Sequence, residues 1–146
     1  MPVTSHWQPY RESLRSVILR TGAIAAALGV AFSVISGRPA RWPLAALLAL
    51  WPSFGGHWVE VWFLNRLRPR LSGGRLVQIA ARVFVWFIAG AGFVIAMRLS
   101  LLALTRTVPP RWPGWWLGGF AFVGIELIVH LVLQLRGRPN FYNGLG

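Results

Sequence analysis

The sequence predicts an all-α, polytopic integral membrane protein with four transmembrane helices, and three observations support this fold class. Hydrophobic residues make up 55% of the 146 residues, and the mean hydropathy is positive. Such a composition lies outside the range of soluble globular domains. The apolar residues form four runs, each long enough to cross about 30 Å of hydrocarbon as a helix. Arginines and turn formers separate the runs, so residues 1–146 are expected to form a single transmembrane domain.

The first two helices are expected over residues 16–36 and 42–65. The first run is rich in Ala, Val and Ile, and its Gly29 belongs to a set of small residues that allow a neighbouring helix to approach closely. The second run contains Pro52, which removes one backbone hydrogen bond. A kink or a short unwound segment is therefore expected just before His57.

The last two helices are expected over residues 76–104 and 112–135. The third run is longer than the hydrocarbon is thick, so its helix should tilt or protrude. Gly90-Ala91-Gly92 in this run is best explained by close helix packing, because it follows no strand and opens no phosphate-binding loop.

Basic residues flank the four runs unequally, and this asymmetry predicts the orientation. Cytoplasmic loops carry an excess of basic residues, so both termini are expected in the cytoplasm of a cell membrane such as the bacterial inner membrane. No N-terminal signal peptide is expected, since the first ten residues are polar and contain no basic residue. Nine arginines lie on the predicted cytoplasmic side and four on the other: Arg11, Arg15, Arg20, Arg66, Arg68, Arg70, Arg75, Arg136 and Arg138 against Arg38, Arg41, Arg106 and Arg111.

An internal repeat relates the second and fourth helices. The segment Pro39-Ala40-Arg41-Trp42-Pro43 matches Pro109-Pro110-Arg111-Trp112-Pro113, and the same offset aligns Arg66-Leu67-Arg68-Pro69 with Arg136-Gly137-Arg138-Pro139. The agreement at both ends of the helix predicts two tandem helical hairpins that arose by internal duplication.

Two carboxylates and two imidazoles lie inside the predicted second and fourth helices. The chain has only three acidic residues and three histidines, yet His57 and Glu60 fall in one run and Glu126 and His130 in the other. Ionisable groups in hydrocarbon are costly unless they are paired or hydrated, so they indicate a functional site. The spacings of three and four residues place each pair on one helix face, and the repeat places both pairs at a similar depth. We therefore expect one buried site between these helices.

Five further residues are expected to support this site. Arg20 and Arg82 can form ion pairs with the carboxylates, and Gln134 extends the polar stripe of the fourth helix. Trp58 can line a pocket, and Asn65 ends the stretch that carries the first His/Glu pair.

The His/Glu site favours acid–base or metal-assisted chemistry on a lipophilic small molecule. Burial disfavours charged forms, so a buried carboxyl group and a buried imidazole are suited to exchange protons near neutral pH. The four side chains also match the ligand types of a single divalent metal ion. Alternatives are a b-type haem protein with His57 and His130 as axial ligands, and a proton-coupled transporter or accessory subunit that forms a homo-oligomer. A purely structural pairing of the two helices is a further alternative.

The expected partner is the lipid bilayer and not nucleic acid. The net charge is +12, but the arginines lie at the ends of apolar runs and not on one polar face. The chain has no cysteine, which excludes disulfides, thiolate metal sites and thiol redox chemistry.

Overall fold

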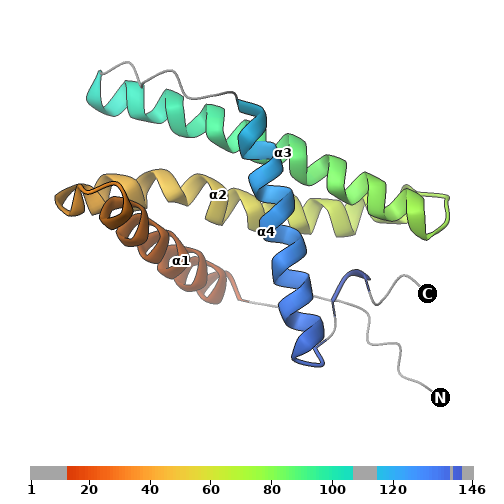
Figure 1. Ribbon diagram of the computed structural model, residues 1–146. Helices are drawn as coiled ribbons and strands as arrows, with labels where there is room; N and C mark the ends of the chain where they lie inside the picture. Colours follow the sequence, from red (N-terminus) through yellow and green to blue (C-terminus); the bar gives the residue numbers. More distant parts are fainter. Residues whose placement is uncertain (1–12, 107–114, 139, 143–146) are drawn as a thin grey trace.

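The structure is a computed structural model that describes residues 13–106, 115–138 and 140–142, and all regular elements within this part are helical. The predicted all-α class is therefore confirmed for the described residues. The expected start of the fourth helix at residue 112 lies outside them. The elements shown in Figure 1 are α1 (Leu14–Ile35), η1 (Pro39–Arg41), α2 (Trp42–Trp62), η2 (Phe63–Leu67), η3 (Arg68–Arg70), α3 (Arg75–Thr105) and α4 (Trp115–Leu135).

Three of the helices, α1, α3 and α4, are long and apolar enough to cross a membrane. In α2, His57, Glu60 and two prolines lower the hydropathy, although the helix has 21 residues. The described part of the chain therefore has helices of the length and composition that suit a membrane protein.

The helices pack mainly as two pairs. α1 lies along α2 and α4 lies against α3, while α2 and α3 contact each other less extensively. Figure 1 shows α1 and α4 on the same side of α2, with α4 crossing α3 steeply. α1 and α4 therefore lie on one side of the layer that α2 and α3 form.

Glycines bring both helix pairs into close contact. A Cβ atom added at Gly29 of α1 would overlap Ala46 of α2, and one added at Gly118 of α4 would overlap Gly90 and Val94 of α3. Small residues at such crossings let backbones approach closely, which is how helices associate inside a membrane. The crossing of α3 and α4 sets how the two helices face each other, and so it positions the polar side chains that follow along both.

We expect Gly118→Ala to destabilise the protein and Gly124→Ala to stabilise it slightly. A Cβ at position 118 would lie 2.8 Å from the Gly90 carbonyl oxygen, whereas a Cβ at position 124 of the same helix meets nothing within 4 Å. Overpacking costs about 1–3 kcal/mol, and Ala in place of Gly in a helix contributes about 0.5–1 kcal/mol. The midpoint of thermal unfolding in detergent measures both effects. Equal midpoints for the two variants would contradict the close crossing.

The expectation before His57 was a kink or a short unwound segment, and the unwound segment is wrong because α2 is helical from Trp42 through Pro52 to Trp62. The Ser53 hydroxyl donates a 2.7 Å hydrogen bond to the Ala49 carbonyl one turn earlier in the same helix. The irregular backbone comes later, because Phe63–Leu67 form a π-helical turn. Such turns are frequent at functional sites, and Phe63 packs against the polar cluster described below.

Candidate functional site

Arg82 of α3 lies at the centre of a buried polar cluster. Its side chain is 1% exposed. The Nε atom donates a 2.5 Å hydrogen bond to Glu126 of α4, and Nη2 donates a 2.9 Å hydrogen bond to Glu60 of α2. The same Nη2 lies 3.5 Å from Nε2 of His130. One guanidinium group therefore connects α2, α3 and α4, and we call Glu60, Arg82, Glu126 and His130 the Arg82 cluster.

His130 and Glu126 lie one turn apart on α4, and both are buried. Nδ1 of His130 lies 2.9 Å from the backbone carbonyl oxygen of Glu126 and 3.2 Å from the side-chain oxygen Oε1 of Glu126. Both neighbours of Nδ1 are acceptors, so the hydrogen of a neutral ring belongs on Nδ1. The lone pair on Nε2 then faces the Arg82 guanidinium.

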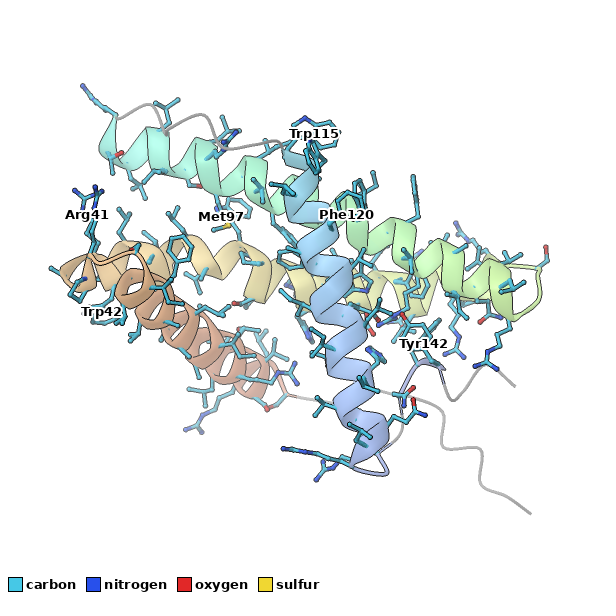
Figure 2. The ribbon with its side chains drawn as sticks, viewed as in Figure 1. Arg41, Trp42, Met97, Trp115, Phe120 and Tyr142 are labelled. Atoms are coloured by element: carbon cyan, nitrogen blue, oxygen red, sulfur yellow. The ribbon has the colours of Figure 1, made fainter. Side chains whose placement is uncertain are left out.

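Tyr142 contacts the cluster from the segment that follows α4 (Figure 2). Its hydroxyl donates a 2.6 Å hydrogen bond to Oε2 of Glu126. Burial and this hydrogen bond raise the pKa of Tyr142 above its ordinary value of 10.0. Tyr142 therefore keeps its proton across the neutral range and remains a donor to the carboxylate.

Phe141 covers Arg82 and is fully buried. Its ring centroid lies 4.3 Å from Cζ of Arg82 and 5.3 Å from Cζ of Arg68, so two cations contact one aromatic ring. The Phe63 ring lies 5.7 Å from the same ring in an edge-on arrangement. Phe141 thus fills the space next to the guanidinium with apolar atoms.

A tight turn returns this segment to the cluster. Gly137 has a φ of +64°, a conformation that glycine adopts without strain. Its N–H donates to the Gln134 carbonyl, and the Arg138 N–H donates to the Leu133 carbonyl. This Schellman pattern ends α4 and reverses the chain.

The structure brings three of the four predicted site residues together and pairs the fourth with an expected supporting residue. Glu60, Glu126 and His130 surround Arg82, whereas His57 Nδ1 lies 3.2 Å from Nη2 of Arg20 on α1. Arg82 was expected only as support, yet it is the residue that links the carboxylates.

The other expected supporting residues lie away from the cluster. Gln134 and Asn65 are exposed. Trp58 is 51% exposed and lines a separate apolar cavity of about 820 Å³ among α1, α2 and α3. Sequence reasoning also missed Phe63, Phe141 and Tyr142. The available signal was the pair of adjacent aromatic residues in an otherwise polar tail.

A second cavity, of about 460 Å³, adjoins the Arg82 cluster and lies between α1 and α4. The ionisable residues on its wall include the cluster and also Arg20 and His57. The remaining wall is mainly aliphatic and aromatic, and it consists of Thr21, Ile24, Leu28, Pro52, Ser53, Gly56, Trp86, Phe122, Ile125 and Val129. An apolar pocket with a few convergent polar groups is the usual form of a small-molecule site.

Trp86 carries a buried donor on the wall of this cavity. Its Nε1 atom has no hydrogen-bond partner among the described residues. The indole ring stacks on Phe122, with centroids 6.5 Å apart and an interplanar angle of 8°. An unpaired buried donor costs about 1–3 kcal/mol. Arg82 Nη1 is likewise unpaired within the described part, but the Phe63 and Phe141 rings adjoin that guanidinium.

The arrangement of the cluster does not fit a metal or a shared haem iron. In the described part of the chain, no three His, Asp or Glu side chains converge as metal ligands. Arg82 bridges the two carboxylates, so a guanidinium takes the position that a metal ion would need. His130 directs Nε2 toward Arg82, and His57 pairs with Arg20. The two imidazoles are therefore engaged by separate arginines.

Comparisons of the chain with models of protein families, with curated proteins and with solved structures find no match. The class of this protein is therefore described from its fold and its site alone. In the residues that the structure describes, it is all-helical, with three helices able to cross a membrane and a buried Arg/Glu/His cluster beside a largely apolar cavity.

Proposed function

We propose that the Arg82 cluster exchanges a proton with a lipophilic molecule bound in the adjoining cavity. The observation that carries the proposal is the arrangement of the cluster, because one guanidinium binds two carboxylates and an imidazole lies beside them on the wall of the cavity. Two carboxylates that share one guanidinium can pass a proton between them, and the ionised one keeps its partner. The cluster is therefore suited to hold and release one proton.

The four cluster residues have different roles in this proposal. Glu60 is 13% exposed and lines the cavity, so it is the group that exchanges a proton with a bound molecule. Glu126 contacts Arg82, His130 and Tyr142, and it is the group that holds the proton between exchanges. Arg82 stabilises whichever carboxylate is ionised. General acid–base catalysis of this kind contributes about 10²–10⁴-fold to a rate.

Proton-coupled transport is the second candidate, and Tyr142 favours it. Tyr142 is half-buried, its hydroxyl donates to Glu126, and the residue is not part of the cavity wall. Glu126 therefore lies between the cavity and a residue at the chain's C-terminal side, which is the arrangement that a proton relay needs.

We expect Glu60→Gln and Glu126→Gln to abolish the activity while the protein stays folded. Glutamine keeps the shape and the acceptor oxygen but cannot cycle a proton. The measurement is a mass-spectrometric comparison of membrane lipids from cells that produce each variant. Wild-type protein should change the amount of at least one lipophilic compound, and the activity of each Gln variant should fall by about 10²-fold or more.

Glu12→Gln is the matched control, since it removes the only other acidic side chain of the protein. It should change the lipid profile as the wild type does. If all three variants act like the wild type, the Arg82 cluster serves only to hold the helices together.

We also propose that α2 crosses the membrane, which gives four transmembrane helices with both termini in the cytoplasm. Its 21 residues are enough to span about 30 Å. The ionisable groups of α2 are engaged within the bundle, because Glu60 binds Arg82 and His57 lies beside Arg20. The excess of arginines in the links Arg66–Arg75 and after α4 supports the orientation.

Two isosteric cysteine substitutions test this topology in a chain without cysteine. Ser36 and Ser72 are both exposed, in the link after α1 and in the link before α3. In intact cells an impermeant thiol reagent should label Ser36→Cys and leave Ser72→Cys unlabelled until the cells are lysed. The reverse pattern would mean the opposite orientation.

We further propose that the two helix pairs arose by duplication. The support is the matching Arg41-Trp42-Pro43 and Arg111-Trp112-Pro113 segments, together with the packing of α1 on α2 and of α4 on α3. Under this proposal α2 and α4 are equivalent helices that each contribute a carboxylate to Arg82.

A further inference from the structure

We propose that the cavity beside the Arg82 cluster opens sideways into the bilayer between α1 and α4, and that it takes up the alkyl chain of a membrane amphiphile through this opening. This inference rests on the proposed function. It specifies which part of the lipophilic molecule is bound and from where that molecule enters.

Four aliphatic side chains form the outer part of the cavity wall. Ile24 and Leu28 come from α1, Ile125 and Val129 come from α4, and all four are between 45% and 54% exposed. The cavity is a partly open cleft. α1 packs on α2 and α4 packs on α3, but the described residues of α1 and α4 make no extensive contact with each other. The gap between α1 and α4 is therefore the opening of the cleft, and we call these four residues the mouth.

The mouth lies halfway along both of its helices, which are long and apolar enough to cross a membrane. Ile24 is the eleventh of the 22 residues of α1, and Ile125 is the eleventh of the 21 residues of α4. At 1.5 Å per residue, each lies about 15 Å from the helix ends. This position is the middle of hydrocarbon that is about 30 Å thick. The mouth contains no ionisable side chain, so it is suited to contact lipid chains and not headgroups or water.

The ionisable residues of the cavity wall carry both signs of charge. The formal charges of the two arginines and the two glutamates cancel, and the two histidines add positive charge only when they are protonated: Arg20, Arg82, Glu60, Glu126, His57 and His130. These charges do not select a head group of one sign. The rest of the wall is mainly aliphatic and aromatic, so the part of an amphiphile that the cavity recognises is the alkyl chain.

Packing provides the free energy for uptake of the chain. A chain that moves from the bilayer into the cleft leaves one apolar environment for another, so it gains little hydrophobic free energy. The side chains around an empty cleft, however, lack contact atoms on one side, and an alkyl chain supplies them. The cavity volume of about 460 Å³ lies within the range of about 300–1,000 Å³ that ligand sites have. We therefore expect the cleft to be occupied by a chain that exchanges with the bilayer.

Photo-crosslinking of the full-length protein in phosphatidylcholine liposomes tests the inference. The probe is a long-chain alcohol with a diazirine in the middle of its chain, mixed into the lipid. Illumination forms a carbene that inserts into the adjacent side chain, and mass spectrometry of peptides locates it. We expect more label on Ser53 and Phe122 of the wall, which are partly buried, than on Leu19 and Ile128, which are 63% and 61% exposed and lie outside it. Simple exposure to lipid would give the opposite order.

The double variant Ile24→Trp/Ile125→Trp should lose most of the label on Ser53 and Phe122, because two bulky side chains narrow the mouth. Leu19→Trp/Ile128→Trp is the matched control, since it adds the same side chains to the same helices at exposed positions outside the wall. It should keep the label.

Three outcomes would overturn the inference. The first is less label in the wild type on the wall residues Ser53 and Phe122 than on Leu19 and Ile128. The second is an unchanged label on the wall when the mouth carries both tryptophans. The third is an equal loss of label in both double variants. The midpoint of thermal unfolding in detergent checks that each variant is folded.

The outcomes separate this inference from the proposed function. Label on the wall that depends on the mouth, combined with a lipid profile that does not depend on Glu60 or Glu126, would leave the uptake of the chain in place and overturn the proton chemistry. A lipid profile that depends on both glutamates, combined with no preference of the probe for the wall, would do the opposite.

Discussion

Replacing Arg82 with alanine is expected to leave little folded protein. Removing one partner of a buried ion pair costs about 3–5 kcal/mol, and Arg82 is the partner of both Glu60 and Glu126. The total stability of a domain is only about 5–15 kcal/mol, so the loss is a large part of it. Arg82→Lys should recover only part of the stability, because a compact ammonium group lacks the planar fork that donates to two carboxylates at once. Unfolding by denaturant in detergent measures these differences.

Arg75→Ala is the matched control on the same helix. Arg75 is the exposed first residue of α3 and carries the same charge. Its removal should change stability by no more than about 0.5 kcal/mol. The triple variant with Arg82→Met, Glu60→Gln and Glu126→Gln replaces the guanidinium and both carboxylates with uncharged side chains. Because no charge of these ion pairs is left buried without a partner, the variant should regain most of the stability lost in Arg82→Ala. If Arg82→Ala and Arg75→Ala unfold alike, the cluster does not hold the helices together.

The helices could be predicted because hydropathy and turn formers depend only on local sequence. The runs around 16–36 and 76–104 became α1 and α3 with small changes at the ends. The sequence also placed Glu60 and Glu126 at a similar depth in their helices, and both carboxylates bind Arg82. This reasoning uses spacing along each helix and needs no knowledge of how α3 is placed.

The central role of Arg82 could not be predicted, because it depends on the rotation of α3 about its own axis. α3 is apolar on most of its circumference, so its sequence does not indicate which face meets α4. The close contact between Gly90 and Gly118 decides that rotation. The sequence therefore did not distinguish Arg20 from Arg82, and the structure shows that Arg82 binds both carboxylates.

The role of the C-terminal segment was missed for a different reason. Turn formers such as Gly137 and Asn140 predict a loop, and a loop carries no periodic pattern that assigns a buried face. Phe141 is nevertheless fully buried and Tyr142 binds Glu126. These contacts depend on tertiary packing against Arg68 and Phe63, which local sequence does not specify.

Phe141→Ala is expected to be the second most damaging substitution. Truncating a fully buried phenylalanine costs about 3–5 kcal/mol, and two further contributions are lost with the ring. The Arg82 and Arg68 guanidinium groups lose their aromatic partner, and each such contact contributes about 0.5–2 kcal/mol. The neighbouring Tyr142 also loses the anchor that holds its hydroxyl on Glu126. Thermal unfolding in detergent measures the total effect.

Phe120→Ala is the control for the loss of a phenyl ring, because Phe120 is 61% exposed on α4 and lies far from the tail in Figure 2. Its cost should stay well below that of Phe141→Ala. Phe141→Leu separates the two contributions, since leucine fills much of the space and offers no aromatic face to Arg82. We expect it to fall between the wild type and Phe141→Ala. Hydrogen exchange of Phe63–Arg70 should accelerate in the same order, because Phe141 packs directly on Phe63 and Arg68. Equal stability of Phe141→Ala and Phe120→Ala would mean that the tail does not cover Arg82, and the guanidinium would then be open to solvent at that side.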